Sequence, residues 1–200
     1  HGESIWVATE GDGLFSLHPQ TGMLKNYIHA EGTENCISSN YVRSLASDIY
    51  GRLWIGTFNG LDILDGEEIT NIKSDPFTLG SLSQPSVRCI MKDNQGGMWA
   101  GTWFGGINYW HPEKNRFRNI QRSIHGDSLN DNIVSCIAED SDSTLWIGTK
   151  SGGLNHYYPN SGVFKYYSLK KNPHNERIES NDIKAIHIDR EDGVIYFGAH

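Results

Sequence analysis

Short apolar runs separated by turn residues dominate the pattern of this chain. Between residues 132 and 167, four such runs are rich in Val, Ile, Trp, Tyr and Phe, and each is bounded by Gly, Asn, Asp, Ser or Pro. Runs of about five residues with this composition are typical of β-strands. No apolar stripe with helical spacing continues for several turns anywhere in the sequence. The stretch therefore predicts four consecutive antiparallel strands.

The same pattern recurs along the whole sequence. The pentapeptide at Leu53–Thr57 returns almost unchanged at Leu145–Thr149, and looser copies lie at residues 5–9, Met98–Thr102 and residues 195–199. The aromatic residues of successive copies are 48, 45, 47 and 50 positions apart. Four antiparallel strands that repeat every forty-odd residues are typical of the blade of a β-propeller.

The sequence thus predicts an all-β fold, a partial β-propeller with about four blades, each a four-stranded antiparallel sheet. We expect full blades at residues 40–72, 86–120 and 132–167, blade ends at 1–27 and a partial blade at 181–200. Residues 1–200 are expected to form a single domain that is a fragment of a larger protein. Because an open arc leaves sheet edges uncovered, we expect the last strands to pair with the first blade, or a homodimer to form.

The four strands of a blade are named A to D from the ring centre outward. Strand B carries the repeated pentapeptide, in which a large ring alternates with a glycine, so neighbouring blades are expected to pack face to face. Strand A is expected at residues 40–48, 86–93, 132–140 and 181–189, each closed by an aspartate that can accept hydrogen bonds from turn amides. A glycine follows three residues later in two of these turns, whereas the turn at 140–143 lacks it.

The cysteines and histidines show no pattern of redox or metal chemistry. Cys89 and Cys136 fall at one position of strand A, where other blades have Ser44 and Ala185, so this position takes a small residue as structural filler. The nine histidines form no H-x-x-x-H or H-x-H pair, so structural or surface roles are expected. We expect neither a metal nor another cofactor.

The charge of the chain argues against some partners. The formal net charge is −7, whereas binding to phosphates needs a face rich in Lys and Arg. We therefore expect no nucleic-acid partner and no contact with a membrane for this fragment. No apolar stretch approaches the roughly 18 residues of a spanning helix, and the first residues lack the charged and apolar regions of a signal peptide.

The departures from the repeat that could carry function are aromatic and polar residues in the turns between strands B and C. An enzyme would show paired carboxylates, a nucleophile with a base, or a metal cluster, and because none is found we expect no catalytic activity. Exposed aromatic rings can stack on the C–H face of a sugar, which points to an oligosaccharide ligand; alternatively, Trp103 packs inward on the adjacent blade. The candidate ligand-binding residues are Trp103, Phe104, Phe58, Asn59, Lys150 and Ser151.

The long loops between strand D and the next strand A are expected on the same rim as these turns. They differ most among themselves, as binding loops on a rigid frame usually do. They span residues 28–39, 73–85, 121–131 and 168–180.

Several linked motifs resemble the two-component regulator propeller repeat. They are residues 38–45, the pattern Asp48-x-x-Gly51-x-Leu53-Trp54-Ile55-Gly56-Thr57, and the tetrapeptide at 152–155. The resemblance covers essentially the whole chain and implies the periplasmic sensor region of a hybrid two-component system, as in gut Bacteroides. The implied function is to recognise an oligosaccharide and to regulate polysaccharide-utilisation genes through a kinase located elsewhere in the parent protein.

Two other classes of function stay open. A propeller lyase or glycoside hydrolase would turn over a polysaccharide or a cyclic peptide, and a protein-interaction platform would use the acidic, loop-rich rim. Turnover of a glycan would favour the enzyme, and saturable binding without product would favour the sensor.

Overall fold

The computed structural model describes residues 4–75, 77–78, 80–113, 117–123, 127–169, 178 and 180–200. The secondary structure of these residues consists of β-strands joined by turns and loops. Within these residues, no helix has the length and apolar character needed to cross a bilayer.

The described residues form five antiparallel sheets in chain order, and each sheet is one blade or part of one. Blade 1 contains β1 (Ile5–Ala8), β2 (Leu14–Leu17) and β3 (Leu24–Tyr27). Blade 2 contains β4 (Val42–Ser47), β5 (Leu53–Thr57), β6 (Gly60–Asp65) and β7 (Glu68–Ile72). Blade 3 contains β8 (Val87–Lys92), β9 (Met98–Thr102), β10 (Ile107–Trp110) and β11 (Phe117–Ile120). Blade 4 contains β12 (Val134–Glu139), β13 (Leu145–Thr149), β14 (Leu154–Tyr158) and β15 (Val163–Tyr167), and blade 5 contains β16 (Ile183–Asp189) and β17 (Val194–Ala199).

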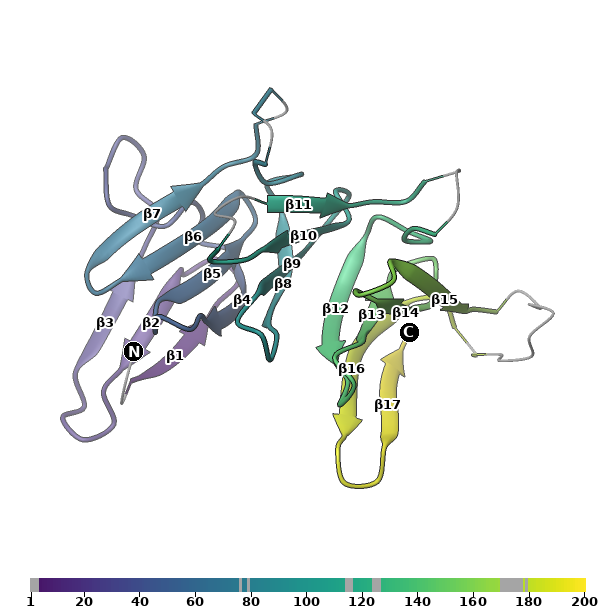
Figure 1. Ribbon diagram of the computed structural model, residues 1–200. Helices are drawn as coiled ribbons and strands as arrows, with labels where there is room; N and C mark the ends of the chain where they lie inside the picture. Colours follow the sequence, from purple (N-terminus) through teal and green to yellow (C-terminus); the bar gives the residue numbers. More distant parts are fainter. Residues whose placement is uncertain are drawn as a thin grey trace.

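The predicted all-β architecture of four-stranded antiparallel blades is confirmed (Figure 1). Strands B of blades 2 to 4 have the predicted bounds. The A strands begin one or two positions later than predicted, at Val42, Val87, Val134 and Ile183 and not at residues 40, 86, 132 and 181. The side chain of Asn40 instead belongs to the preceding loop, because its Oδ1 accepts a hydrogen bond of 2.7 Å from the backbone N–H of His29. A β-bulge between Val42 and Ser44 then sets the register of strand A against strand B.

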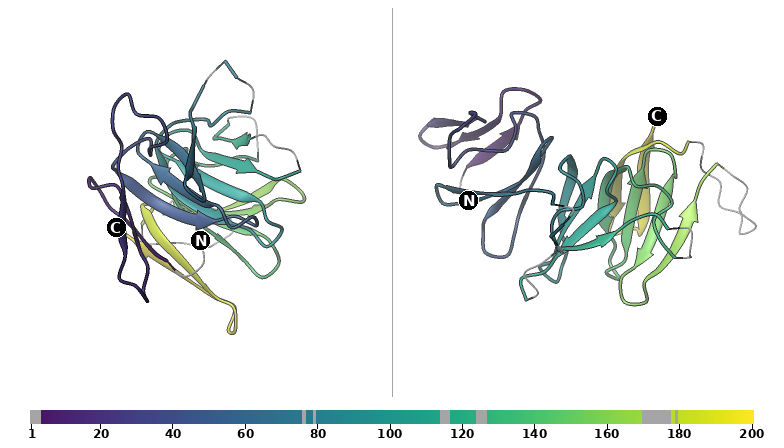
Figure 2. Two further views of the ribbon diagram at one scale, coloured as in Figure 1. Left: turned by 90° about the vertical axis from the view of Figure 1, so that its left-hand side faces the viewer. Right: turned by 90° about the horizontal axis from the view of Figure 1, so that it is seen from above.

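The blades follow one another from the N-terminal sheet at one end to the β16–β17 hairpin at the other (Figure 2). Among the described strands, β1 pairs with β2 alone and β17 with β16 alone. Blades 1 and 5 therefore form no common sheet, and the predicted closure by strand pairing is not seen. Association with a second copy stays a prediction.

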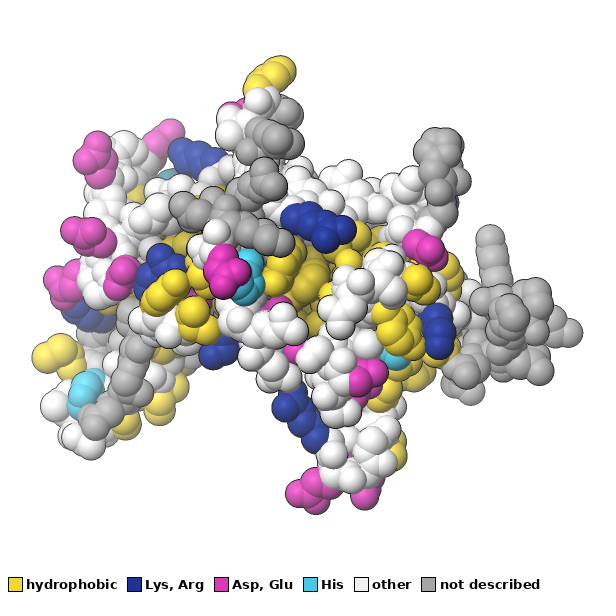
Figure 3. Space-filling model, in the orientation of Figure 1, with side chains coloured by type: hydrophobic (Ala, Val, Ile, Leu, Met, Phe, Trp, Pro, Cys, Tyr) yellow, Lys and Arg dark blue, Asp and Glu magenta, His cyan; other side chains and the backbone are white. Residues whose placement is uncertain are grey.

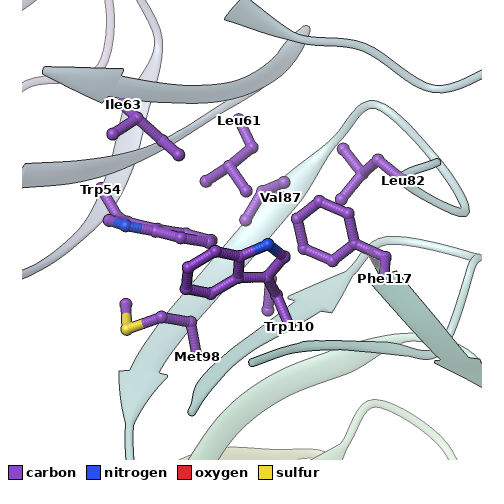
Figure 4. Close-up of a cluster of buried hydrophobic side chains, with 9 residues drawn as sticks. Trp54, Leu61, Ile63, Leu82, Val87, Met98, Trp110 and Phe117 are labelled. Atoms are coloured by element: carbon purple, nitrogen blue, oxygen red, sulfur yellow. The ribbon is translucent and has the colours of Figure 1, made fainter. Parts of the chain in front are cut away.

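The alternation of ring and glycine in strand B explains how neighbouring blades pack. Trp54 of β5 is fully buried in a cluster that includes Val87 and Met98 of blade 3 (Figure 4), and its ring centre lies 5.2 Å from that of Trp110. A Cβ added at Gly56 would lie 2.9 Å from Cγ1 of Val87. The tryptophan thus fills the interface and the glycine lets the next strand A approach, because core packing leaves no room for another atom.

The aspartate at the end of each strand A organises the turn into strand B. Oδ1 of Asp93 accepts hydrogen bonds from the backbone N–H groups of Gln95 (3.0 Å) and Gly97 (2.7 Å). Turn amides also donate to the side chains of Asp48, Asp140 and Asp189. The structural role predicted for these carboxylates is confirmed.

Candidate ligand-binding rim

The turns between strands B and C of blades 2, 3 and 4 lie on one rim, beside the beginnings of the A strands. One backbone hydrogen bond is repeated at each turn: Phe58 N–H to Tyr41 O (3.0 Å), Trp103 N–H to Ser86 O (3.0 Å) and Lys150 N–H to Ile133 O (3.1 Å). Because this bond fixes each turn in the same way, the six predicted residues occupy equivalent positions. We call this surface the B–C rim, defined by residues 58–59, 103–104 and 150–151.

The loops that precede the A strands are clamped to strand C where they reach this rim. A loop N–H donates to a buried side chain of strand C in each full blade: Ser38 to Asp62 (2.8 Å), Ser83 to Asn108 (2.8 Å) and Asn130 to Asn155 (3.1 Å). The loop residue before each clamp is a buried aliphatic side chain: Ile37, Leu82 and Leu129. The end of this loop therefore has the same conformation-fixing contacts in each of the three full blades. These clamps were not predicted from the sequence, although the polar residue after the first apolar residue of strand C is a usable signal for them.

Trp103 packs against cations from two blades. The guanidinium carbon of Arg88, on β8, is 4.3 Å from the centre of its ring, and Nζ of Lys150, in the turn of blade 4, is 4.9 Å from it. Phe104 meets the same ring edge-on, with ring centres 5.7 Å apart, and is 59% exposed. Such cation–π contacts favour a fixed ring orientation. Trp103 is thus half-exposed while it also contacts the adjacent blade through Lys150.

Phe58 repeats this arrangement in blade 2. The Arg43 guanidinium carbon is 5.1 Å from its ring centre, and Tyr41 packs at 6.3 Å. Arg43 also donates a hydrogen bond of 2.9 Å from Nη1 to Oγ of Ser86, at the start of blade 3. Arg43 precedes Phe58 by the same 15 positions that separate Arg88 from Trp103. The two turns are therefore joined into one row of aromatic and cationic side chains.

The remaining two predicted residues shape the turns through their backbones. Asn59 N–H donates to Oγ1 of Thr57 (3.2 Å), and Ser151 N–H donates to Oδ2 of Asp131 (2.8 Å). Both residues are exposed, so their side chains are available to a ligand.

A hollow of about 360 Å³ lies next to this row, on the side of the ring axis. It is lined by Ala8, Glu10, Val42, Arg43, Arg88 and Ser135. Arg43, Arg88 and Ser135 occupy equivalent positions in β4, β8 and β12. Each directly follows the valine that begins its strand A. Arg43 and Arg88 are not among the residues predicted from the sequence, although the recurrence of arginine at this position is visible there.

A second cavity, of about 240 Å³, opens between blades 3 and 4 at the opposite rim. Asp93, Trp99, Tyr109, Arg118, Glu139 and Tyr157 are among its lining residues. Burial raises the pKa of Glu139, although the N–H of Asn94 donates to its carboxylate at 2.9 Å. In the space-filling view, hydrophobic side chains gather in the middle of the face below β11 (Figure 3). No site was predicted here from the sequence.

The two strand A cysteines are poor nucleophiles in this structure. Burial raises the pKa of Cys89 to about 12 and that of Cys136 to about 11, so both are thiols at neutral pH. Each lies opposite the glycine of strand B, Cys89 beside Gly101 and Cys136 beside Gly148. This geometry fits a role as small filler residues.

These features define a β-propeller built of four-stranded blades. The family model for the two component regulator propeller matches residues 36–59, 81–104 and 128–151. Each match runs from the clamped loop end through strands A and B into the B–C turn. The chain therefore contains three repeats of the kind that this family model describes.

Solved structures share the fold of this chain. The extracellular domain of a putative hybrid two component system from B. thetaiotaomicron has 24% identity and a TM-score of 0.71, over 86% of this chain and 24% of that one. The extracellular domain of a putative one component system from the same organism has 21% identity and a TM-score of 0.76, over 99% and 25%. Virginiamycin B lyase from Staphylococcus aureus has 14% identity and a TM-score of 0.69, over 98% and 60%.

At these identities the similarity concerns the fold. The chain spans about a quarter of the length of the two sensor domains, 24% and 25%. No curated protein sequence matches the chain.

Proposed function

We propose that this chain is a ligand-sensing segment in the periplasmic domain of a hybrid two-component sensor. In this proposal it recognises an oligosaccharide and regulates polysaccharide-utilisation genes through a kinase elsewhere in the parent protein. The observation that carries the proposal is the row on the B–C rim, where Trp103 is held by Arg88 and Lys150 beside the exposed ring of Phe104.

The chemistry of this row suits a sugar. Phe58 and Phe104 are 55% and 59% exposed, so each ring offers a face for the C–H groups of a pyranose. The side chains of Asn59, Lys150 and Ser151 are exposed around them and can bond to hydroxyl groups. The backbone hydrogen bond at each B–C turn keeps these groups in place before a ligand arrives, which lowers the entropy lost on binding.

The family and its structural neighbours give this proposal its setting. The repeat is described as that of a two component regulator, and two neighbours of the same fold are extracellular domains of putative one component and hybrid two component systems. An extracytoplasmic location and a signalling role without catalysis by this segment are therefore part of the proposal.

Calorimetry with a panel of plant and host oligosaccharides tests the proposal. We expect saturable binding without product, weakened by about 1–3 kcal/mol in the variants Trp103→Ala and Phe104→Ala, as for a lost aromatic contact. Tyr50→Ala is the matched control, because Tyr50 is also exposed and packs against a cation, Arg52, but lies at the turn between strands A and B on the opposite rim. Product formation would point to a lyase or hydrolase. Absence of binding to every sugar would point to a protein partner.

A further inference from the structure

Two arginines line the hollow beside the B–C rim. Arg43 and Arg88 occupy the same position in the neighbouring inner strands β4 and β8, and both are half-buried. Each is oriented by an aromatic ring, Arg43 by Phe58 at 5.1 Å and Arg88 by Trp103 at 4.3 Å. The two guanidinium groups are therefore held in place at the wall of one hollow.

Within the described part of the chain, these two cations have no carboxylate partner in an ion pair. Lys25, Arg52 and Lys184 each form an ion pair, with Glu67, Asp48 and Asp182 respectively. Among the described residues, neither Arg43 nor Arg88 lies within ion-pair distance of a carboxylate, and the hydrogen bond of Arg43 goes to the neutral hydroxyl of Ser86.

The electrostatics of the hollow favour an added negative charge. Burial and the nearby positive charge of Arg43 both lower the pKa of Arg88, and Cys89, Asp182 and Glu10 act in the opposite direction. Two like charges at a half-buried site repel each other, and an anion between them removes this repulsion. Glu10 also lines the hollow, and its carboxylate can accept a hydrogen bond from a sugar hydroxyl.

We propose that the hollow binds the carboxylate of an acidic sugar, so that the oligosaccharide recognised on the B–C rim contains a uronic acid. The carboxylate would lie between the guanidinium groups of Arg43 and Arg88, which can each donate two parallel hydrogen bonds to it. The hydroxyl of Ser135 completes the wall where blade 4 lacks a third arginine. The volume of the hollow, about 360 Å³, falls within the range of small-molecule sites, which begins at about 300 Å³. The inference rests on the function proposed above.

The test compares acidic oligosaccharides with their neutral counterparts. Short oligosaccharides of galacturonic, glucuronic and mannuronic acid, and the carboxyl-reduced form of each, are titrated into the protein. We expect at least one acidic oligosaccharide to bind at least about tenfold more tightly than its reduced form, because charge-assisted hydrogen bonds are lost on reduction. Arg43→Gln and Arg88→Gln should each weaken that binding at least about tenfold, and Arg88→Lys should recover only part of it.

A matched control and the melting temperature separate binding from folding. Arg118→Gln removes a charge at the opposite rim and should change the dissociation constant by less than about twofold, because exposed charges at a distance are screened by salt. The binding result of a variant counts only if its melting temperature equals that of the unmodified protein. If an arginine variant fails this criterion, Ser135→Asp replaces it. This variant adds a negative charge to the hollow and should also weaken binding of the acidic oligosaccharide.

The outcomes separate this inference from the proposed function. Equal binding of acidic and reduced oligosaccharides, or binding insensitive to Arg43 and Arg88, would overturn the inference and leave the sugar sensor standing. Acetate or sulfate alone binding as tightly as the acidic sugars would show a site for small anions and also overturn it. Binding of no oligosaccharide of any kind would overturn both.

Discussion

Nε1 of Trp54 donates a hydrogen bond of 3.0 Å to Oδ2 of Asp48, across the turn that joins β4 to β5. The same bond joins Trp99 to Asp93 at 2.7 Å and Trp146 to Asp140 at 3.0 Å. The aspartate therefore connects the turn to the ring that fills the next blade interface, and this contact explains the constant spacing of the two residues.

Replacing Asp48 by asparagine is expected to cost about 2–3 kcal/mol at neutral pH, because a buried carboxylate loses its bonds to Trp54 and Arg52. Burial alone would raise the pKa of Asp48, but the hydrogen bonds from Trp54 and Arg52 and the charge of Arg52 together lower it. A lowered pKa gives stability that is present above the unfolded-state value of about 4 and is lost as the pH falls through the folded-state value. Urea unfolding should therefore show the difference between the two proteins shrinking at low pH. The exposed Asp65, changed to asparagine, serves as control, and a difference independent of pH would contradict the argument.

Ser143→Gly is expected to stabilise the chain by about 0.5–1 kcal/mol. Ser143 has a φ of 60°, in the left-handed region, at the turn position where Gly51 and Gly96 have φ of 77° and 86°. A side chain in this region is strained, and glycine removes the strain at some cost in chain entropy. Thermal unfolding measures the gain. The reciprocal Gly51→Ser should lose a similar amount, and no change in either variant would show that the turn is unstrained.

Gly101→Ala should destabilise the chain by about 1–3 kcal/mol, because the added Cβ overpacks a blade interface. That atom would lie 2.5 Å from Cγ1 of Val134 and 2.6 Å from Sγ of Cys89. Gly198 occupies the same motif position in blade 5, and a Cβ there would meet nothing within 4 Å. Gly198→Ala should therefore change the free energy of unfolding by less than about 0.5 kcal/mol. Equal losses in the two variants, measured by urea unfolding, would rule out the packing argument.

Asp62→Asn tests the one acidic loop clamp. Burial raises the pKa of Asp62, despite hydrogen bonds from Ser38 and Asn71. A carboxyl with a raised folded-state pKa contributes full stability below the unfolded-state value of about 4, and stability is lost as the pH rises through the folded-state value. As the pH rises, the free energy of unfolding of the variant should therefore increase relative to that of the unmodified protein, by on the order of 1 kcal/mol. Unfolding at several pH values measures this, with Asn108→Asp expected to introduce the opposite trend. A parallel pH profile for the variant and the unmodified protein would contradict it.

We expect this chain to associate with a second copy as a homodimer. Ile5 and Val7 of β1 are 52% and 48% exposed, and Phe197 of β17 is 39% exposed, on strands that each have one partner strand. Exposed apolar edges of this kind promote association. Light scattering over a range of concentrations should detect the dimer, and Val7→Lys should weaken it. A monomer at every concentration would contradict this expectation.

Much of the blade could be predicted because its signals are local. The bounds of β5, β9 and β13 follow from five-residue apolar runs between turn residues, and the role of the aspartates follows from a turn of a few residues. The beginning of β4 could not be predicted, because the side chain of Asn40 bonds to the backbone of His29, eleven residues earlier, and no local pattern shows this contact.

The part of the candidate rim that depends on local signals could also be predicted from the sequence. The sequence by itself determined the repeat, the blade architecture and the position of Trp103, Phe104 and their counterparts in equivalent turns, because strand period and turn chemistry act between near neighbours. Only the tertiary structure decided that Arg88 and Lys150 meet at Trp103, and that Arg43 and Arg88 share one hollow. These contacts join different strands and blades, and their geometry is set by how the blades pack around the axis, which no pattern within a single repeat specifies.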